Sequence, residues 1–199
     1  MSLPIACLRW AAAIAFSMVL ADFARAADRE FGGVTFSEST FVSISPKPFV
    51  LSGLAGMEQN FVTYYAVALY VPYGAKERDT LINALAPLKF QLIWTTPALS
   101  EKSVQAYWRS AFAKSVDNAE SLARIGPRID TFAGYFGELK FGDRTDLEYN
   151  PDLGMKLFIN GKHKGNFAGV EFNRALIQIW LGKHDSASAM RASLLVGVR

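Results

Sequence analysis

Few residues of this sequence have the spacing that catalysis requires. The chain lacks a G-x-S-x-G nucleophile motif, a phosphate-binding Walker loop and a G-x-G-x-x-G dinucleotide loop. Its two histidines, His163 and His184, are far apart in the sequence, and each has a turn-like context. Neighbouring residues point to opposite sides of a regular element, so adjacency alone does not make His184 and Asp185 a catalytic dyad. We therefore expect two exposed loop histidines in preference to a paired metal site.

The aromatic side chains are a more informative group. They fall on segments that read as strands and helices, where they would either line an apolar cavity or fill an ordinary core. Composition alone favours the ordinary core, and a buried tyrosine hydroxyl would need a hydrogen-bond partner in both cases. The residues concerned are Phe61, Tyr64, Tyr65, Tyr70, Trp94, Tyr107, Trp108, Phe112 and Trp180.

The strands that would carry some of these aromatics are recognisable from their periodicity. Residues 61–71 have two largely apolar faces, which predicts a central strand covered on both sides, and Pro72 ends it. Residues 88–95 alternate in the same way. Further strands are expected at 34–36, 48–52, 144–149, 155–159 and 162–167. Asn160-Gly161 predicts a tight hairpin between the last two.

Helices are expected at 76–85, after Ser100, after Asp117, at 170–181 and after Asp185. Ser100 has the position of an N-cap, and Asp117 with Glu120 has capping-box spacing. Gly126-Pro127 is expected to interrupt the third helix, and Gly182 to end the fourth. Strands and helices occur in runs, so the predicted class is α+β with a mostly antiparallel sheet.

The first 26 residues have the features of a secretory signal peptide. Arg9 precedes an apolar run at 11–20, and Ala24-Arg25-Ala26 fits a cleavage site. The run is much shorter than the ~20 residues that span a bilayer, so a membrane anchor is the weaker alternative. We expect one domain at 27–199 in the periplasm or outside the cell, without a transmembrane segment.

The single cysteine, Cys7, lies in the leader, so the mature chain has no disulfide. A net charge of only +3 gives no indication of nucleic-acid binding.

Three segments in succession resemble the bacterial, secreted branch of the chalcone isomerase-like family. The first joins LSGLAGM at 51–57 to FVTYYAVALYVP at 61–72, and the second joins LSEK at 99–102 to YWRSAF at 107–112. The third joins LFINGK at 157–162 to FNRALIQIWLG at 172–182. The resemblance implies an open-faced β-sandwich of the chalcone-isomerase type. Its long, mostly antiparallel sheet would be packed by helices, with a ligand cleft between them.

The same resemblance implies that the polar residues of the enzymes are missing here. The arginine that steadies the substrate's oxyanion aligns with Met57, the strand threonine with Tyr65 and the late threonine with Ile179. The helix tyrosine and asparagine align near Ser103 and Ser110. Because this chemistry depends on positioned charge and hydrogen bonds, their loss argues against the isomerase reaction. Met57 also lacks the charge with which related fatty-acid-binding members hold a carboxylate.

We therefore expect a non-catalytic periplasmic protein that binds a small hydrophobic ligand: a lipid, an aromatic compound or a porphyrin. Two alternatives stay open. One is an isomerase or intramolecular lyase with a rearranged site that uses Tyr64, Tyr65 or Tyr107 as an acid, and the other is a structural or interaction protein. The cofactor is not identified by the sequence, and heme is the weakest ligand candidate because neither histidine lies on an element expected to line the cleft. The cleft candidates are Met57, Phe61, Tyr64, Tyr65, Ser103, Tyr107, Trp108, Ser110, Ile179 and Trp180.

Overall fold

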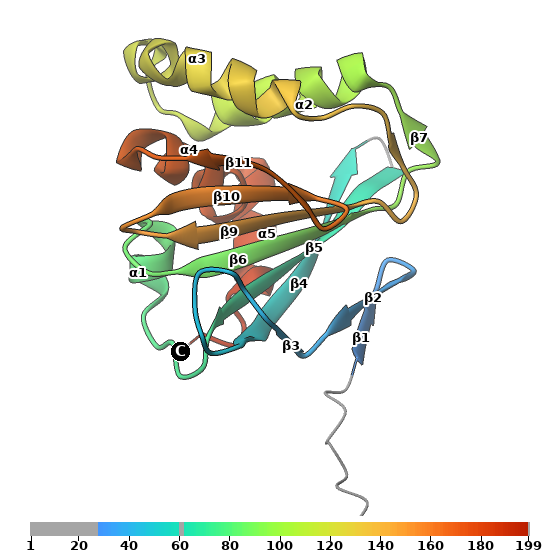
Figure 1. Cartoon of the computed structure of the whole chain (residues 1–199), viewed down its shortest axis with the longest axis vertical. Helices are drawn as coiled ribbons and strands as arrows, with labels where there is room; N and C mark the ends of the chain where they lie inside the picture. The colour runs from blue at the N-terminus through green and yellow to red at the C-terminus, as the bar shows by residue number, and fades with distance from the viewer. Residues whose placement is uncertain (1–27, 60–61, 199) are drawn as a thin grey trace, which may run out of the picture.

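A seven-stranded antiparallel sheet forms the centre of the molecule (Figure 1). The computed structural model describes residues 28–59 and 62–198, so the expected leader and Phe61 lie outside the described residues. The strand order is β11-β10-β9-β6-β5-β4-β3. These strands are β3 (Ser39–Thr40), β4 (Phe49–Gln59), β5 (Val62–Pro72), β6 (Leu88–Trp94), β9 (Arg144–Asn150), β10 (Gly154–Ile159) and β11 (Lys162–Phe167). Two small two-stranded sheets pair β1 (Asp28–Phe31) with β2 (Val34–Ser37) and β7 (Ala98–Leu99) with β8 (Leu139–Lys140).

Strand β5 confirms the prediction of a central strand with two buried faces. Tyr65, Val67 and Leu69 face the helices and belong to the main hydrophobic core. Ala66, Ala68 and Tyr70 face the other way and pack with Phe36 and other residues near the N-terminus. The sheet therefore separates a large helix-covered core from a smaller second core, which explains why both faces of the strand are apolar.

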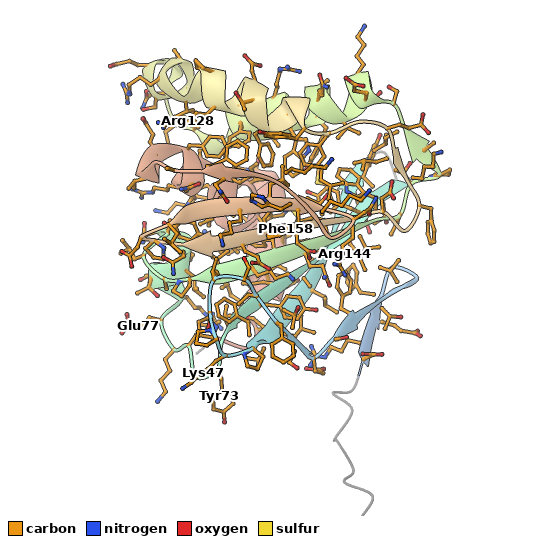
Figure 2. The ribbon with its side chains drawn as sticks, in the orientation of Figure 1. Lys47, Tyr73, Glu77, Arg128, Arg144 and Phe158 are labelled. Carbon is orange, nitrogen blue, oxygen red and sulfur yellow. The ribbon has the colours of Figure 1, made fainter. Side chains whose placement is uncertain are left out.

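Within the described residues, five helices complete the α+β fold that the sequence predicts. They are α1 (Arg78–Ile82), α2 (Glu101–Ser115), α3 (Ala119–Gly134), α4 (Val170–Leu181) and α5 (Asp185–Leu194). Figure 2 shows side chains filling the space between the sheet and the pair α2 and α3. Aromatic rings dominate this layer. Trp108 packs edge-on against Phe132, with ring centroids 5.0 Å apart, and against Trp180, with ring centroids 6.1 Å apart. No helix in the described ranges is long and apolar enough to cross a membrane.

Local signals placed the start of α2 and both ends of α4 correctly. The Ser100 hydroxyl accepts a hydrogen bond from the Ser103 amide at 3.2 Å, as expected of an N-cap. The predicted capping box at Asp117 is wrong, because Asn118 caps α3 by accepting from the Ser121 amide at 2.8 Å. Helix α5 is capped at His184, so Asp185 is its first residue and not its cap.

Two further helix predictions need correction. Gly126-Pro127 does not interrupt α3, which runs continuously from Ala119 to Gly134. One missing amide donor costs less than the burial of Ile125, Ile129 and Phe132 on one face of the helix. The first helix, Arg78–Ile82, is shorter than the expected 76–85. After its C-cap at Asn83, Ala84 has a positive φ of 58°, which prevents the helix from continuing.

The Asn160-Gly161 hairpin forms as predicted between β10 and β11. Both residues have positive φ, 50° and 75°, which is the backbone conformation of a type I′ turn. Ile159 pairs with Lys162 across the turn.

Candidate functional site

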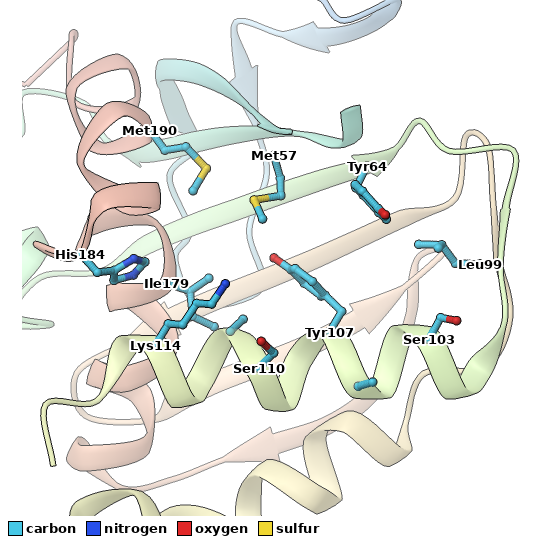
Figure 3. A pocket seen from close by; sticks show the side chains of 12 residues that line it. Met57, Tyr64, Leu99, Ser103, Tyr107, Ser110, Lys114, Ile179, His184 and Met190 are labelled. Carbon is cyan, nitrogen blue, oxygen red and sulfur yellow. The ribbon is translucent and has the colours of Figure 1, made fainter. Parts of the chain in front are cut away.

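A pocket of about 350 Å³ opens between α2, α4, α5 and the adjoining ends of β4 and β5. Figure 3 shows α2 as one wall and Met57, Tyr64 and Met190 on the opposite side. The residues that line it are Met57, Tyr64, Leu99, Ser103, Ala106, Tyr107, Ser110, Ala111, Lys114, Ile179, His184 and Met190.

The α2 wall of this pocket carries a polar stripe. Ser103, Tyr107, Ser110 and Lys114 recur at intervals of four, three and four residues, which places them on one face of the helix. Val104, Trp108 and Phe112 occupy the neighbouring face and are completely buried. Burial of that aromatic face fixes the rotation of α2 about its axis, so the polar stripe is held toward the pocket.

The facing wall is largely apolar and is contributed by elements that are distant in sequence. Met57 comes from β4, Ile179 from α4 and Met190 from α5. Helix α5 reaches this position because it docks directly on β4, where the Ser52 hydroxyl donates to the Leu194 carbonyl at 2.7 Å. A Cβ atom on Gly53 would overlap the backbone oxygens of Ser193 and Leu194, so only glycine permits this approach.

A chain of hydrogen bonds leads from the core to the pocket. The Trp180 indole N–H donates to the Tyr65 hydroxyl at 3.0 Å, and that hydroxyl lies 2.5 Å from the Tyr107 hydroxyl. If Tyr107 were the donor, the buried Tyr65 hydrogen would have no acceptor, and such a group is costly to leave unsatisfied. We infer that Tyr65 donates to Tyr107, which leaves the Tyr107 hydrogen available to a molecule in the pocket.

Burial keeps both hydroxyls of this chain protonated. Desolvation raises the pKa of Tyr65 to about 12, although its hydrogen bonds to Tyr107 and Trp180 oppose the rise. Desolvation also raises the pKa of Tyr107 well above its ordinary value, and the neighbouring Tyr65 adds to the effect. Near neutral pH both groups are therefore neutral hydrogen-bond donors, and their raised pKa makes them weaker acids than an exposed phenol.

The structure brings six of the ten sequence-predicted cleft residues to the pocket. These are Met57, Tyr64, Ser103, Tyr107, Ser110 and Ile179. Tyr65, Trp108 and Trp180 are fully buried beside the pocket and contribute to its support without lining it. Phe61 is outside the described residues. Of the other aromatics considered for a cavity, Trp94 and Phe112 belong to the helix-covered core and Tyr70 to the second core.

Six lining residues were not among the predicted ones: Leu99, Ala106, Ala111, Lys114, His184 and Met190. Lys114 was within reach of sequence reasoning, because it follows Tyr107 by seven residues and Ser110 by four on one helix face. The expectation that neither histidine lines the cleft is wrong for His184. This residue is half-buried at the start of α5, where its Nε2 lies 3.1 Å from the Gln178 carbonyl. His163 is exposed on β11 and contacts Asn166 and Phe158.

Lys114 and His184 are the pocket's basic side chains, and both lie at the same end of it (Figure 3). Among the described residues, Lys114 has no carboxylate oxygen within the 4.0 Å of an ion pair, in contrast to Arg109 on the same helix, which pairs with Asp130 at 2.8 Å. No group of three or more potential metal-binding side chains was found within residues 28–59 and 62–198.

The comparisons with known proteins agree with this architecture. The model of the chalcone isomerase-like family matches residues 28–196. Among solved structures, the fold is similar to the crystal structure of the Arabidopsis thaliana fatty-acid binding protein AtFAP1, with a TM-score of 0.67. The two chains are 15% identical, and the similarity covers 85% of this chain and 96% of AtFAP1. A search of curated proteins gave no match. The family match spans nearly all described residues, so this chain belongs to the chalcone isomerase-like family.

Proposed function

We propose that this protein binds a small hydrophobic ligand, without converting it, in the pocket between α2 and the β4–α5 wall. The observation that carries the proposal is the pocket itself, in which an apolar wall faces one preorganised hydroxyl donor, Tyr107. Ligand sites are commonly concave, mostly apolar and equipped with a few placed polar groups. The fold's similarity to a fatty-acid binding protein supports the same function.

The pocket volume narrows the kind of ligand. About 350 Å³ is near the lower end of the roughly 300–1,000 Å³ of small-molecule sites, which favours a single acyl chain or a small aromatic compound. A porphyrin is a poorer candidate. Its macrocycle is the largest of the three ligand types considered, and it fits a pocket of about 350 Å³ less well than an acyl chain or a small aromatic compound does.

The tyrosines argue for binding over acid catalysis. A general acid works best with a pKa near the operating pH, whereas burial moves the pKa of Tyr65 to about 12 and that of Tyr107 upward as well. Met57, at the position where the enzymes of the family carry an arginine, is uncharged and does not stabilise an oxyanion. The pocket is therefore suited to holding a molecule with an apolar body and a hydrogen-bond acceptor.

A neutral, environment-sensitive dye such as Nile red tests the proposal. Ala106 and Ala113 are both exposed on α2, but only Ala106 lines the pocket. We expect saturable dye binding that Ala106→Phe reduces strongly, because the added ring occupies the pocket, whereas Ala113→Phe leaves it unchanged. Equal binding by both variants, or no saturable signal from the wild-type protein, would contradict the proposal and favour an interaction protein with a filled core.

We also propose that the protein acts in the periplasm or outside the cell after removal of residues 1–26. The support is the leader sequence, in which the apolar run at 11–20 precedes Ala24-Arg25-Ala26. The intact mass of the protein from its host should correspond to a chain that begins at or near Ala27. A mass that retains Met1, recovered from the cytoplasmic fraction, would overturn this assignment.

A further inference from the structure

The pocket is asymmetric in charge along the α2 axis. Leu99 and Ser103 lie at one end, and Lys114 and His184 lie at the other (Figure 3). The described lining residues include no carboxylate. A bound molecule therefore meets positive charge at one end only, next to the apolar side chain of Ile179.

The environment of Lys114 suits it to pair with a ligand. It is exposed, so its ammonium group needs no buried partner, and it makes no ion pair among the residues that the structure describes. In Figure 3 its side chain extends from α2 into the pocket beside Ile179, and its tip lies between His184 and the Tyr107 hydroxyl. A charge-assisted hydrogen bond to an anion at this place would cost little desolvation of the lysine, because the group stays at the mouth of the pocket.

Lys114 also has a role that would need no ligand. It is in the last turn of α2, where a positive charge interacts favourably with the free carbonyl groups of the helix end. That role predicts an effect on folding stability alone, and it gives no preference among ligands that differ only in head-group charge. The two roles are therefore separable by experiment.

We propose that Lys114 selects ligands with an anionic head group, such as a carboxylate, and places that group at the α5 end of the pocket. The inference rests on the proposed binding function and assigns the chemical class of its ligand. The apolar body of the ligand then runs along Ile179 and Met57 toward Tyr107. On α2, Tyr107 and Lys114 are separated by an axial rise of about 10 Å along the helix, and both side chains point into the pocket (Figure 3). The charge that Met57 does not provide is thus supplied from the opposite wall.

Three ligands with the same alkyl chain test the inference: dodecanoate, dodecanol and dodecyltrimethylammonium, each titrated below its micelle concentration in competition with Nile red. We expect the wild-type protein to bind dodecanoate more tightly than dodecanol. Lys114→Gln should weaken dodecanoate binding about fivefold, the size of a partly exposed ion pair, and leave dodecanol binding unchanged. Lys114→Glu should reverse the preference toward dodecyltrimethylammonium.

Lys102→Gln is the matched control, because Lys102 is exposed on the same helix and does not line the pocket. It should alter none of the three affinities. If wild-type protein binds the alcohol as tightly as the acid, or Lys114→Gln weakens both equally, this inference is wrong while the binding function stands. If none of the three displaces the dye and the dye itself does not bind, the proposed function fails, and the inference with it.

Discussion

At the scale of single residues, the molecule places its hydrogen-bonding groups with a defined direction. The indole of Trp180 donates only, so it fixes Tyr65 as an acceptor on one side and as the donor to Tyr107 on the other. A buried network with every member satisfied holds its side chains in one arrangement. The pocket thereby receives a hydroxyl whose orientation is set by a tryptophan on a different element.

Tyr65→Phe should destabilise the fold by about 1–3 kcal/mol, because it leaves the Trp180 N–H buried without a partner. Urea unfolding of the purified protein measures this change. Tyr64→Phe is the control, since Tyr64 is only partly buried and has no hydrogen bond from its hydroxyl among the described contacts. Equal stability of the two variants would contradict the contribution assigned to the Trp180–Tyr65 hydrogen bond.

Alkaline pH should weaken the fold through the same tyrosine. Because the pKa of Tyr65 is raised to about 12 in the folded protein, the unfolded chain loses this proton first, at about pH 10. The stabilisation is complete below about pH 10 and is lost as the pH rises toward 12. Unfolding free energies measured between pH 8 and pH 11.5 should fall above pH 10, and less steeply in Tyr65→Phe. A slope unaffected by that substitution would disprove the contribution of Tyr65.

At the scale of elements, the pocket depends on how closely α5 approaches β4. The contact is anchored by Ser52, whose carbonyl also accepts from the Gly197 amide at 2.9 Å. Gly53 beside it leaves room for the backbone of α5. Met190 and His184 reach the pocket only because the helix is held in this position.

Gly53→Ala should therefore displace α5 and weaken dye binding. The new methyl group overlaps the backbone oxygens of Ser193 and Leu194, which cannot move without a shift of the helix. Gly126→Ala is the matched control. Its new methyl meets open space within α3, so we expect unchanged dye binding and a stability gain of up to about 1 kcal/mol. Thermal unfolding and Nile red titration of both variants measure these effects, and normal dye affinity in Gly53→Ala would refute this account of the pocket wall.

At the scale of the whole molecule, the sheet carries apolar contacts on its helix-covered face and a buried ionic cluster on the other. Lys89 is 4% exposed, and its Nζ atom lies 3.3 Å from a carboxylate oxygen of Asp146 and 3.8 Å from one of Glu148. Glu148 also accepts from the Ser43 amide at 2.8 Å and so ties the segment between β3 and β4 to the sheet. The cluster holds the segment around Ser43 against β6 and β9, on the face of the sheet opposite the helices and the pocket.

Lys89→Met should destabilise the protein by about 3–5 kcal/mol, because it leaves Glu148 buried without its cation. Asp146 retains its ion pair with Arg144 at 2.9 Å in this variant. We therefore expect the loss of stability to affect mainly the segment around Ser43, which Glu148 holds. Lys47→Met, at an exposed site, serves as the control. Denaturant unfolding measures the free energy of unfolding of both variants. Hydrogen exchange shows which amides lose protection. Unaltered protection of the Ser43 amide would contradict this assignment.

The sequence by itself determined the elements and the type of fold. Three features are local patterns: the two apolar faces of residues 61–71, the Ser100 cap and the Asn160-Gly161 turn. Local backbone physics is sufficient to interpret them. The family resemblance added the order of the elements and brought Met57, Ser103, Ser110 and Ile179 into consideration together. Where local patterns failed, at Asp117 and at Gly126-Pro127, tertiary burial of one face of α3 outweighed them.

Only the tertiary structure decided which side chains meet in the pocket. Helical spacing places Lys114 on the same face of α2 as Tyr107 and Ser110, but no periodicity relates that face to His184 and Met190, which come from the beginning and middle of α5. Likewise, the donor direction at Tyr107 follows from Trp180, which is on a different helix. Periodicity shows which face of a helix or strand is buried. What the buried face of α5 contacts is determined by the close approach of this helix to β4 at Gly53.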